Sequence, residues 1–402
     1  MAEKKWIKFH HRIVRNILFA VLYPYTKLKY GITIEKFKNE VDGPFVILYN
    51  HQTAFDQFFV GMSVKGSVYY LASEDIFSNG WVSSIIRHLV APIPIKKQTL
   101  DISAIKTCIR VAKEGGTIAI APEGNRTFSG KTEYINPAIA SLVKKINLPV
   151  LLFRIEGGYG VHPRWSDVVR KGKMRAYVSE IITSDEVKSL SKDELFERIN
   201  NGLYVDEAND INVYNHHKRA EYLERAIYVC PYCNLSTFES NGLTIRCVKC
   251  NREIEYQEST RLKGVEFDLP FSFVSVWYDY QKEYINNFDP TQHTDAPLYI
   301  EKVSFSEVIV YKKKVSICKD ATVSLYGNRI VIDKNYEGSF DFDFDKISAV
   351  TILGKNKLNI YADGKIYQLK GEKRFNALKY VHMYNRYKNF IRGDQDGEFL
   401  GL

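Results

Sequence analysis

The 402-residue sequence predicts an α/β domain, a mixed sheet covered by helices, followed by a small zinc ribbon and a mostly β C-terminal domain. Apolar strand-like segments alternate with helical segments over residues 41–222, which is typical of α/β folds. Two Cys-x-x-Cys pairs follow within residues 223–258. Short β-type segments separated by turn signals then fill residues 259–402, with one closing helix. A basic segment, residues 1–40, precedes the first domain.

The strands expected in the α/β domain are largely apolar and show no alternation with polar residues. A strand that faces solvent on one side alternates apolar and polar residues, whereas a strand covered on both faces does not. The segment Thr-Ile-Ala-Ile-Ala at 117–121 is of the second kind. The predicted strands span residues 45–49, 68–72, 91–95, 117–121 and 148–153. Helices are expected over residues 55–64, 101–112 and 137–145, and the charged stretch 184–222 is also expected to be helical.

Positive charge is concentrated in residues 1–40. They hold nine Lys and Arg against three acidic residues, which is +6 of the chain's net charge of +9. A basic segment favours an anionic partner, either a lipid surface or nucleic acid. The apolar run 17–23 ends at Pro24 and is shorter than the ~20 residues that cross a bilayer, so we expect an interfacial helix. One alternative is a helix packed on the domain's own core. Another is a secretory signal, which fits less well because no small-x-small cleavage site follows the apolar run.

A histidine and an aspartate follow the first predicted strand in the order Asn50-His51-x4-Asp56. An Asp that accepts a hydrogen bond from one imidazole nitrogen fixes the tautomer and leaves the other nitrogen as a base. The spacing therefore predicts a catalytic dyad. The structural alternative is a capping box in which Thr53 and Asp56 begin the next helix.

A second polar loop, Pro-Glu-Gly-Asn-Arg-Thr at 122–127, follows the buried strand 117–121. The carboxyl ends of strands in α/β sheets are where ligands bind. Gly124 permits close backbone approach, and the guanidinium of Arg126 can hold a phosphate through two parallel hydrogen bonds. A plain surface turn with a solvated arginine is the alternative.

These segments resemble the four ordered motifs of the glycerolipid acyltransferase family, whose best-known members are the 1-acyl-glycerol-3-phosphate acyltransferases. The resemblance covers roughly residues 1–200. The matching segments are Asn50-His51-x4-Asp56, Ile93-Pro94-Ile95-Lys96-Lys97, Pro122-Glu123-Gly124-x-Arg126 and Leu148-Pro149-Val150.

The resemblance implies that the protein is an acyltransferase. His51 is then the general base that deprotonates the acceptor hydroxyl, and Asp56 is its orienting partner. The co-substrate would be acyl-CoA or acyl-acyl carrier protein. Because a thioester is already activated, no covalent enzyme nucleophile is required, and we interpret Cys108 as a core residue.

The resemblance also implies an acceptor-binding set around the second and third motifs. Asn125 and Thr127 stand where the family more often has Thr and Ser, but both can hydrogen-bond a headgroup. Lysine stands in the second motif where arginine is common, which gives a point charge instead of a planar fork. The expected acceptor-binding residues are Glu123, Gly124, Asn125, Arg126, Thr127, Lys96 and Lys97.

Two cysteine pairs at ribbon spacing predict a structural zinc site. Four thiolates at this spacing are typical of a closed tetrahedral site. Asn234 and Asn251 follow the pairs, where a left-handed backbone is common and Asn tolerates it well. A redox role for the Cys-Pro-Tyr-Cys pair is the alternative. The predicted ligands are Cys230, Cys233, Cys247 and Cys250.

The C-terminal region combines hairpin signals with a final helix. Turn signals stand at 326–328, 354–356 and 363–364, and residues 375–390 are expected to form the helix. This order resembles a pleckstrin-homology-like barrel closed by a helix. Such a module would bind lipid headgroups or a protein, or serve as a scaffold without a ligand.

We therefore expect a membrane-associated acyltransferase of phospholipid biosynthesis that acts on a lysophosphatidate-type acceptor. It would be peripheral or monotopic on the cytoplasmic face of an anionic membrane, with acyl carrier protein as one expected partner. Glycerol 3-phosphate and other lysophospholipids are alternative acceptors. The alternative from another class is a nucleic-acid-binding or lipid-tethering protein with an inactive acyltransferase domain. Nucleic acid is not expected, because the basic segment lies far in sequence from the ribbon.

Overall fold

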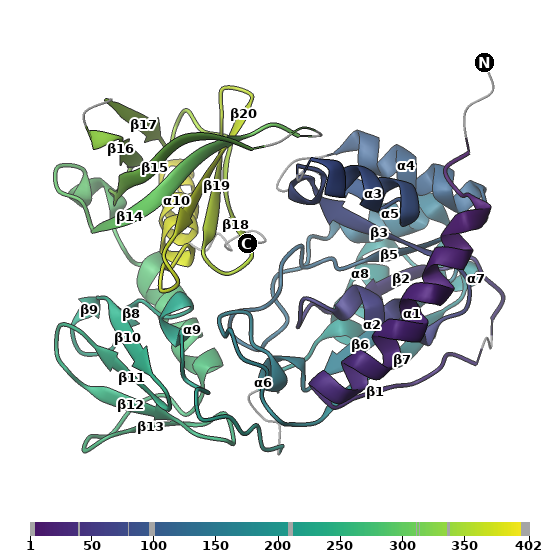
Figure 1. The fold of residues 1–402 in the computed structure, drawn as a ribbon, viewed down its shortest axis with the longest axis horizontal. Helices are drawn as coiled ribbons and strands as arrows, with labels where there is room; N and C mark the ends of the chain where they lie inside the picture. Colours follow the sequence, from purple (N-terminus) through teal and green to yellow (C-terminus); the bar gives the residue numbers. More distant parts are fainter. Residues whose placement is uncertain are drawn as a thin grey trace. The chain divides into compact units, whose positions relative to one another are not determined.

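The computed structural model describes residues 5–38, 41–78, 80–95, 101–207, 212–310, 312, 314–335 and 338–394. The chain divides into two compact units (Figure 1). Unit 1 runs to Pro163 and resumes from Val169 to Tyr214. Unit 2 holds Arg164–Val168 and the chain from Asn215 onward.

Unit 1 is built on a seven-stranded mixed sheet in the order β1-β7-β6-β2-β5-β3-β4. The five strands from β6 to β4 are parallel, while β7 runs antiparallel to β6 and parallel to β1. This confirms the expected α/β class; β1 and β7 were not predicted. The strands are β1 (Ile32–Ile34), β2 (Val46–Tyr49), β3 (Val68–Ser73), β4 (Ile93–Ile95), β5 (Thr117–Ile120), β6 (Val150–Glu156) and β7 (Met174–Ile182).

Helices cover both faces of this sheet, which explains why β2 (Val-Ile-Leu-Tyr) and the first four residues of β6 (Val-Leu-Leu-Phe) are apolar and buried on both sides. In β2, Val46 and Leu48 join one buried cluster with α4, α5 and α8, whereas Ile47 and Tyr49 join the opposite cluster with α1 and α2. The helices are α1 (Phe9–Tyr30), α2 (Asp56–Ser63), η1 (Glu74–Phe77), α3 (Trp81–Leu89), α4 (Ile102–Lys113), α5 (Ala138–Ile146), α6 (Gly158–Val161), α7 (Ser184–Ser189) and α8 (Lys192–Leu203).

The helix expected around the apolar run 17–23 is present as α1, which continues through Pro24 to Tyr30. One expectation about helices in unit 1 was wrong. Residues 184–222 were expected to be helical throughout, but α8 ends at Leu203. The chain then runs extended, because the backbone of Val205 hydrogen-bonds to the backbone and hydroxyl of Thr132.

The first part of unit 2 contains small antiparallel sheets, β8–β9 and β10-β11-β12-β13. Asn234 and Asn251 adopt φ values of +63° and +57°, which confirms the left-handed backbone expected at these positions. The elements are η3 (Leu223–Arg225), β8 (Val229–Cys230), β9 (Asn234–Leu235), β10 (Phe238–Asn241), β11 (Thr244–Cys247), β12 (Glu253–Tyr256) and β13 (Leu262–Gly264).

The rest of unit 2 is a seven-stranded antiparallel sheet in the order β17-β16-β15-β14-β20-β19-β18, with a closing helix. Each of the three predicted turns lies between consecutive strands, so the β-rich C-terminal region is confirmed. The strands are β14 (Tyr299–Val308), β15 (Lys314–Leu325), β16 (Arg329–Asp333), β17 (Ser339–Asp343), β18 (Ala349–Leu353), β19 (Lys357–Ala362) and β20 (Lys365–Gly371). The helices are α9 (Val274–Asn286), η4 (Pro290–His293) and α10 (Leu378–Arg392).

Helix α9, which was not predicted, joins the cysteine-containing sheets to the rest of unit 2. The indole of Trp277 donates to the carbonyl of Val229 at 2.8 Å. The side-chain oxygen of Gln281 accepts from the amides of Tyr228 and Val229 at 2.7 and 3.1 Å. A buried indole and a buried amide thus satisfy the backbone next to Cys230. The domain boundaries expected from the sequence stay predictions.

Candidate active site

The two polar loops of the predicted site leave the sheet at the same edge. β2 and β5 are parallel neighbours, so His51 and Glu123 follow strand ends that lie side by side. β6 pairs with β2 on its other side. The Asn50 side chain ties β2 to β6 by donating to the Ile155 carbonyl at 2.8 Å and accepting from the Ile155 amide at 2.7 Å. The sheet therefore assembles one site from three segments that are distant in the sequence.

His51 and Asp56 are hydrogen-bonded to each other. The Nδ1 atom of His51 lies 2.8 Å from a carboxylate oxygen of Asp56. The side chain of His51 is 21% exposed, whereas that of Asp56 is fully buried. Because an ionised carboxylate only accepts, we assign the proton to Nδ1, which makes Nε2 the basic nitrogen. The ring can then take a proton from a hydroxyl bound on its exposed side.

Further donors fix the Asp56 carboxylate. It accepts from the Gln52 amide at 2.6 Å, from the Thr53 amide at 2.9 Å and from the Thr53 hydroxyl at 2.6 Å. The bonds from Thr53 are those of the capping-box alternative, although α2 begins at Asp56 itself and Phe55 provides no side-chain cap. One carboxylate therefore shapes the turn into α2 and also orients His51.

Glu123 joins its own loop to the histidine loop. One carboxylate oxygen accepts from the His51 amide at 2.7 Å, and the other accepts from the Glu133 amide at 2.8 Å. The Thr127 amide donates to the His51 carbonyl at 3.1 Å. Burial raises the pKa of Glu123 well above its ordinary value, against the opposite effect of its two backbone hydrogen bonds. In this arrangement Glu123 positions the backbone of His51, and the acceptor role expected for it stays a prediction.

Arg126 brings a positive charge to the same edge of the sheet. Burial lowers the pKa of its guanidinium, whereas the nearby Asp56 and Tyr30 raise it. The guanidinium stays protonated at neutral pH, because the ordinary pKa of arginine lies far above that range. A cation is therefore within electrostatic reach of the carboxylate that orients the imidazole.

The other residues of the third motif shape the loop. Gly124 has a φ of +69°, in the left-handed region that favours glycine, and a Cβ there would meet nothing within 4 Å. The buried Thr127 hydroxyl accepts from the amides of Ser129 and Gly130 at 3.2 and 3.0 Å. Asn125 is also buried. Thr127 thus stabilises its own turn, and acceptor binding by Asn125 and Thr127 stays a prediction.

The second and fourth motifs belong to separate parts of the sheet: the second contains the edge strand β4, and the fourth leads into the central strand β6. Lys96 and Lys97 lie outside the described residues; β4 ends directly before them and pairs with β3. The fourth motif leads into β6, and the carbonyl of Pro149 accepts from the Val46 amide at 3.0 Å.

Tyr30, the last residue of α1, lies beside the histidine loop and was not predicted. Its ring centroid is 5.3 Å from that of Phe55 and 5.9 Å from that of His162. Its buried hydroxyl has no hydrogen-bond partner among the residues that the structure describes. No sequence signal marks Tyr30, because its position depends on how α1 packs across the sheet.

The loop after β6 was also missed. A Cβ on Gly158 would lie only 2.6 Å from the Cβ of Gln52, so glycine allows this loop to pack against the histidine loop. Gly157, at a φ of +74°, donates its amide to Glu207 at 2.7 Å. The Gly-Gly pair directly after a buried strand was the available signal.

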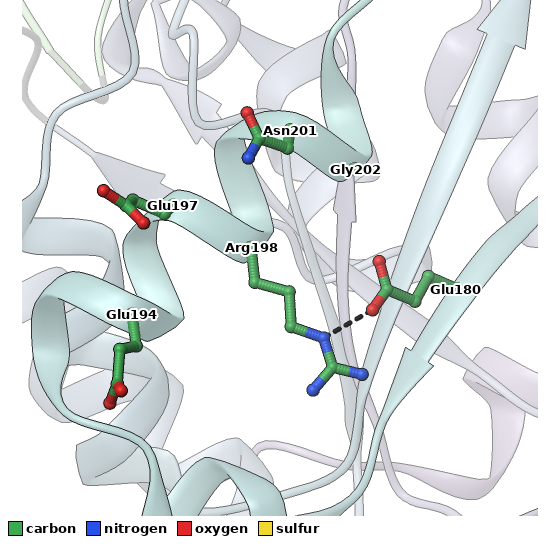
Figure 2. A pocket seen from close by; sticks show the side chains of 6 residues that line it. All are labelled: Glu180, Glu194, Glu197, Arg198, Asn201 and Gly202. Carbon is green, nitrogen blue, oxygen red and sulfur yellow. Dashed lines mark hydrogen bonds and ion pairs between the residues drawn. The ribbon is translucent and has the colours of Figure 1, made fainter.

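A surface hollow of about 480 Å³ lies elsewhere on unit 1 (Figure 2). Its residues come from β7 and α8, and none belongs to the four motifs. Three carboxylates at this surface disfavour a phosphorylated ligand. The hollow is lined by Glu180, Glu194, Glu197, Arg198, Asn201 and Gly202.

Helix α1 exposes a stripe of apolar side chains. Residues four apart lie on one face of a helix, and four such residues are 46–81% exposed. They are Phe9, Ile13, Ile17 and Val21. Within the described part of the chain, no helix combines the length and the apolar character needed to span a bilayer.

Four cysteine sulfurs gather in unit 2 within 4.8 Å of one another. The Sγ atoms of Cys230 and Cys250 are 3.8 Å apart, and those of Cys233 and Cys247 are 3.4 Å apart. Four thiolates bound to one tetrahedral zinc at ~2.3 Å would be about 3.8 Å from each other. The cysteines are free of disulfides, so the donor set and its spacing fit a Zn²⁺ ion.

Comparisons with known proteins agree with the geometry of unit 1. Residues 31–155 match the family model "Acyltransferase". The chain therefore carries an acyltransferase domain, which contains both the histidine and the arginine loops.

Two curated relatives are each similar to less than half of the chain. The 1-acyl-sn-glycerol-3-phosphate acyltransferase of Bacillus subtilis (strain 168) is 24% identical over 172 residues, which cover 42% of this chain and 81% of the relative. The chloroplastic 1-acyl-sn-glycerol-3-phosphate acyltransferase LPAT1 of Arabidopsis thaliana is 25% identical over 181 residues, or 44% of this chain and 49% of the relative. The chain thus spans about half the length of the chloroplast protein.

A solved structure was also found. The crystal structure of the 1-acyl-sn-glycerophosphate (LPA) acyltransferase PlsC from Thermotoga maritima is 22% identical, with a TM-score of 0.38. The likeness covers 48% of this chain and 75% of that chain.

Proposed function

We propose that unit 1 transfers a fatty acyl group from an acyl thioester to the hydroxyl of a lysophosphatidate-type acceptor, as a step of phospholipid biosynthesis. The observation that carries this proposal is the His51–Asp56 pair beside the loop that holds Arg126. A base suits a hydroxyl nucleophile, and a guanidinium suits a phosphate. The names of the two curated relatives support the same acceptor class.

The transfer is a single acyl substitution. Nε2 of His51 takes the proton of the acceptor hydroxyl while its oxygen attacks the thioester carbonyl carbon. The buried Asp56 stabilises the imidazolium that forms. The tetrahedral intermediate then collapses, the carbon–sulfur bond breaks, and the imidazolium returns the proton to the leaving thiolate. The products are an acylated acceptor and a free thiol.

A covalent acyl-cysteine intermediate is not part of this proposal. Cys108 is the cysteine of α4, and its side chain is fully buried in the core cluster that α4, α5 and α8 form against the sheet. Burial raises the pKa of the Cys108 thiol to about 12, so the reactive thiolate is scarce at neutral pH.

The acceptor phosphate would be held by the loop after β5. Arg126 supplies the charge, and Gly124 leaves the loop backbone open to the ligand. Asn125, Thr127, Lys96 and Lys97 complete the proposed acceptor site, and either acyl-CoA or acyl-acyl carrier protein serves as donor.

An acceptor panel tests this proposal. Purified protein is given labelled lysophosphatidate, glycerol 3-phosphate or another lysophospholipid, each with both thioester donors. We expect transfer to lysophosphatidate above the other acceptors, and its loss by ~10²–10⁴-fold in His51→Ala. The His217→Ala variant, which changes an exposed histidine of unit 2, should retain transfer. Transfer at the wild-type rate by His51→Ala would refute the proposed mechanism.

We also propose that the protein binds the cytoplasmic face of an anionic membrane as a peripheral or monotopic protein. The exposed apolar stripe of α1 supports this, since apolar side chains beside basic ones suit a lipid headgroup boundary. Docking through α1 would keep the acceptor lipid close to the edge that carries His51.

Unit 2 is proposed to contain a structural zinc ribbon and a pleckstrin-homology-like module. The spacing of the four sulfurs supports the first assignment. The antiparallel sheet with α10 supports the second. Zinc would neutralise the thiolates of Cys230, Cys233, Cys247 and Cys250 and link the two Cys-x-x-Cys pairs. It would have no part in acyl transfer.

A further inference from the structure

We propose that α3 is a second membrane-binding element, and that α1 and α3 together form one docking surface for an anionic phospholipid leaflet. The inference deepens the proposed membrane association, which by itself involves only the N-terminal segment. It rests on three independent properties of α3: exposed apolar side chains, its place beside α1, and its charge.

Helix α3 presents apolar side chains to solvent. Trp81, Val82 and Ile85 are 75%, 39% and 45% exposed. The buried Ser83 faces the other way, and its hydroxyl donates to the Ile76 carbonyl at 2.7 Å. Adjoining exposed apolar groups on a folded domain indicate an interaction site, and tryptophan suits the boundary between headgroups and acyl chains.

The chain topology puts α3 on the same face of the sheet as α2 and α1. The crossovers β2–α2–β3 and β3–α3–β4 both join parallel strands and both move toward the β4 edge. Since such crossovers are right-handed, α2 and α3 cover the same face. Helix α1 lies on this face, because Tyr30 packs in one cluster with Phe59 of α2. Figure 1 draws α1 and α3 on the near side of the unit.

Direct contacts join the two helices. The imidazole of His10 in α1 stacks on that of His88 in α3, with ring centroids 4.7 Å apart. His10 Nε2 also lies 2.7 Å from the carbonyl of His88. The indole of Trp6 donates to the carbonyl of Ala91, directly after α3, at 3.1 Å. The amino end of α1 is therefore fixed beside the carboxyl end of α3.

The charge of both helices favours an anionic surface. Neither the 22 residues of α1 nor the 9 residues of α3 include Asp or Glu. Exposed basic side chains flank the apolar ones: Arg12, Lys27 and Lys29 in α1, and Arg87 in α3. Each basic residue close to an anionic leaflet contributes about 1 kcal/mol to binding. An apolar protein surface would not be attracted by this positive charge, whereas an anionic lipid surface would.

The second helix has a mechanical consequence. A single apolar stripe leaves a domain free to rotate about the axis of the helix that carries it. Contact through α3 as well removes this rotation. The edge of the sheet that carries His51 would then keep one orientation toward the leaflet that supplies the acceptor.

Tryptophan fluorescence tests the inference without reference to acyl transfer. Of the four tryptophans, Trp165 and Trp277 are fully buried and Trp6 is half-buried, so Trp81, at 75%, is the most exposed indole. The full chain is mixed with vesicles of phosphatidylglycerol and phosphatidylcholine whose acyl chains carry bromine, a contact quencher. We expect quenching in the wild type, and much weaker quenching in Trp81→Phe with vesicle binding retained, because the half-buried Trp6 is then the only other indole near this surface. Equal quenching in the wild type and in Trp81→Phe would overturn the inference.

Vesicle sedimentation supplies the second measurement. The double variant Trp81→Ser/Ile85→Ser is expected to bind at least about tenfold more weakly than the wild type. The matched control is Ile300→Ser, which changes a 62% exposed isoleucine of β14. If Ile17→Ser weakens binding and the α3 variant does not, α3 is excluded while docking through α1 stands. If the wild type does not bind vesicles at all, both proposals fail. Circular dichroism spectra establish that each variant is folded.

Discussion

The Asp56 carboxylate is surrounded by hydrogen-bond donors. Its two carboxylate oxygens accept hydrogen bonds from the imidazole of His51, the amide of Gln52 and the hydroxyl of Thr53. An amide at this position has only one acceptor oxygen. Its NH₂ group would meet another donor.

Asp56→Asn should therefore separate orientation from folding. We expect kcat to fall by ~10²–10⁴-fold, because Asn can hold His51 in the wrong tautomer, with Nε2 protonated. KM for the acceptor should change much less, since Asp56 does not bind it. Steady-state kinetics with thioester and acceptor varied in turn measure both quantities. Thr53→Val is the control, because it removes one partner of Asp56 and leaves the bond to His51. A kcat for Asp56→Asn equal to that of Thr53→Val would contradict the assignment.

At this scale the sequence identifies groups more readily than their tasks. The spacing of His51 and Asp56 indicated a pair, since the loop between a strand end and a helix start brings both to one place. The same reasoning could not show that both carboxylate oxygens of Glu123 accept hydrogen bonds from backbone amides. One of these amides belongs to Glu133, which lies in a loop without a recognisable sequence pattern. Tyr30 was beyond reach because its approach depends on tertiary packing.

Among the elements, α9 and α10 enclose a histidine that the site does not use. The ring of His382 lies between two tyrosines: the Tyr228 hydroxyl is 2.7 Å from Nδ1, and the Tyr278 hydroxyl is 3.4 Å from Nε2. Burial, together with the positive charge of Lys282, lowers the pKa of His382 to about 3. The imidazole is thus neutral in the folded protein at neutral pH.

The stability of unit 2 should accordingly fall in mild acid. An unfolded histidine has a pKa of about 6.5, so between pH 6.5 and pH 3 the unfolded state binds the extra proton. His382 therefore lowers the free energy of unfolding by up to about 1.4 kcal/mol for each pH unit below 6.5. Urea unfolding, followed by the fluorescence of the buried Trp165 and Trp277, measures this slope between pH 7 and pH 5.

The control variant is His382→Gln, which removes the titrating ring. We expect its slope over pH 5–7 to be flatter than that of the wild type, whatever its absolute stability. Asp167 does not interfere in this window. Burial raises its pKa, but hydrogen bonds from Arg225 and Lys355 outweigh this and lower it to about 2. An unchanged slope in His382→Gln would show that the ring is not the group responsible.

Elements with a strong local pattern were predicted, and those that depend on tertiary contacts were not. The buried strands β2, β5 and β6 stood out because helices on both faces of the sheet favour consecutive apolar residues. The turns at 326–328, 354–356 and 363–364 were visible through Gly and Asn. Strand β1 has only three residues, and α3 is a short helix whose apolar side faces solvent. Neither carries the burial pattern on which sequence reasoning depends.

For the whole molecule, the two compact units divide the chemistry. The histidine and arginine loops belong to unit 1, and the four cysteines belong to unit 2. Strand β8 links the first cysteine pair to helix α9. The amides of Tyr228 and Val229 donate to Gln281, and the Val229 carbonyl accepts from Trp277. Loss of order at Cys230 would remove these partners from α9 and leave buried polar groups unsatisfied.

Removal of the metal should therefore unfold unit 2 and spare the reaction. We expect the purified chain to contain one zinc per molecule by elemental analysis, and Cys250→Ala to contain much less. Structural zinc contributes on the order of 10 kcal/mol to folding in small ribbons. In Cys250→Ala, the thermal unfolding transition that the fluorescence of Trp165 and Trp277 reports should therefore shift to a markedly lower temperature. Acyl transfer at low temperature should persist, because His51, Asp56 and Arg126 lie in the other unit. Cys318→Ala is the matched control, since Cys318 lies outside the cluster. A wild-type chain without stoichiometric zinc, or a Cys250→Ala variant that melts like Cys318→Ala, would show that the cluster does not hold unit 2 together.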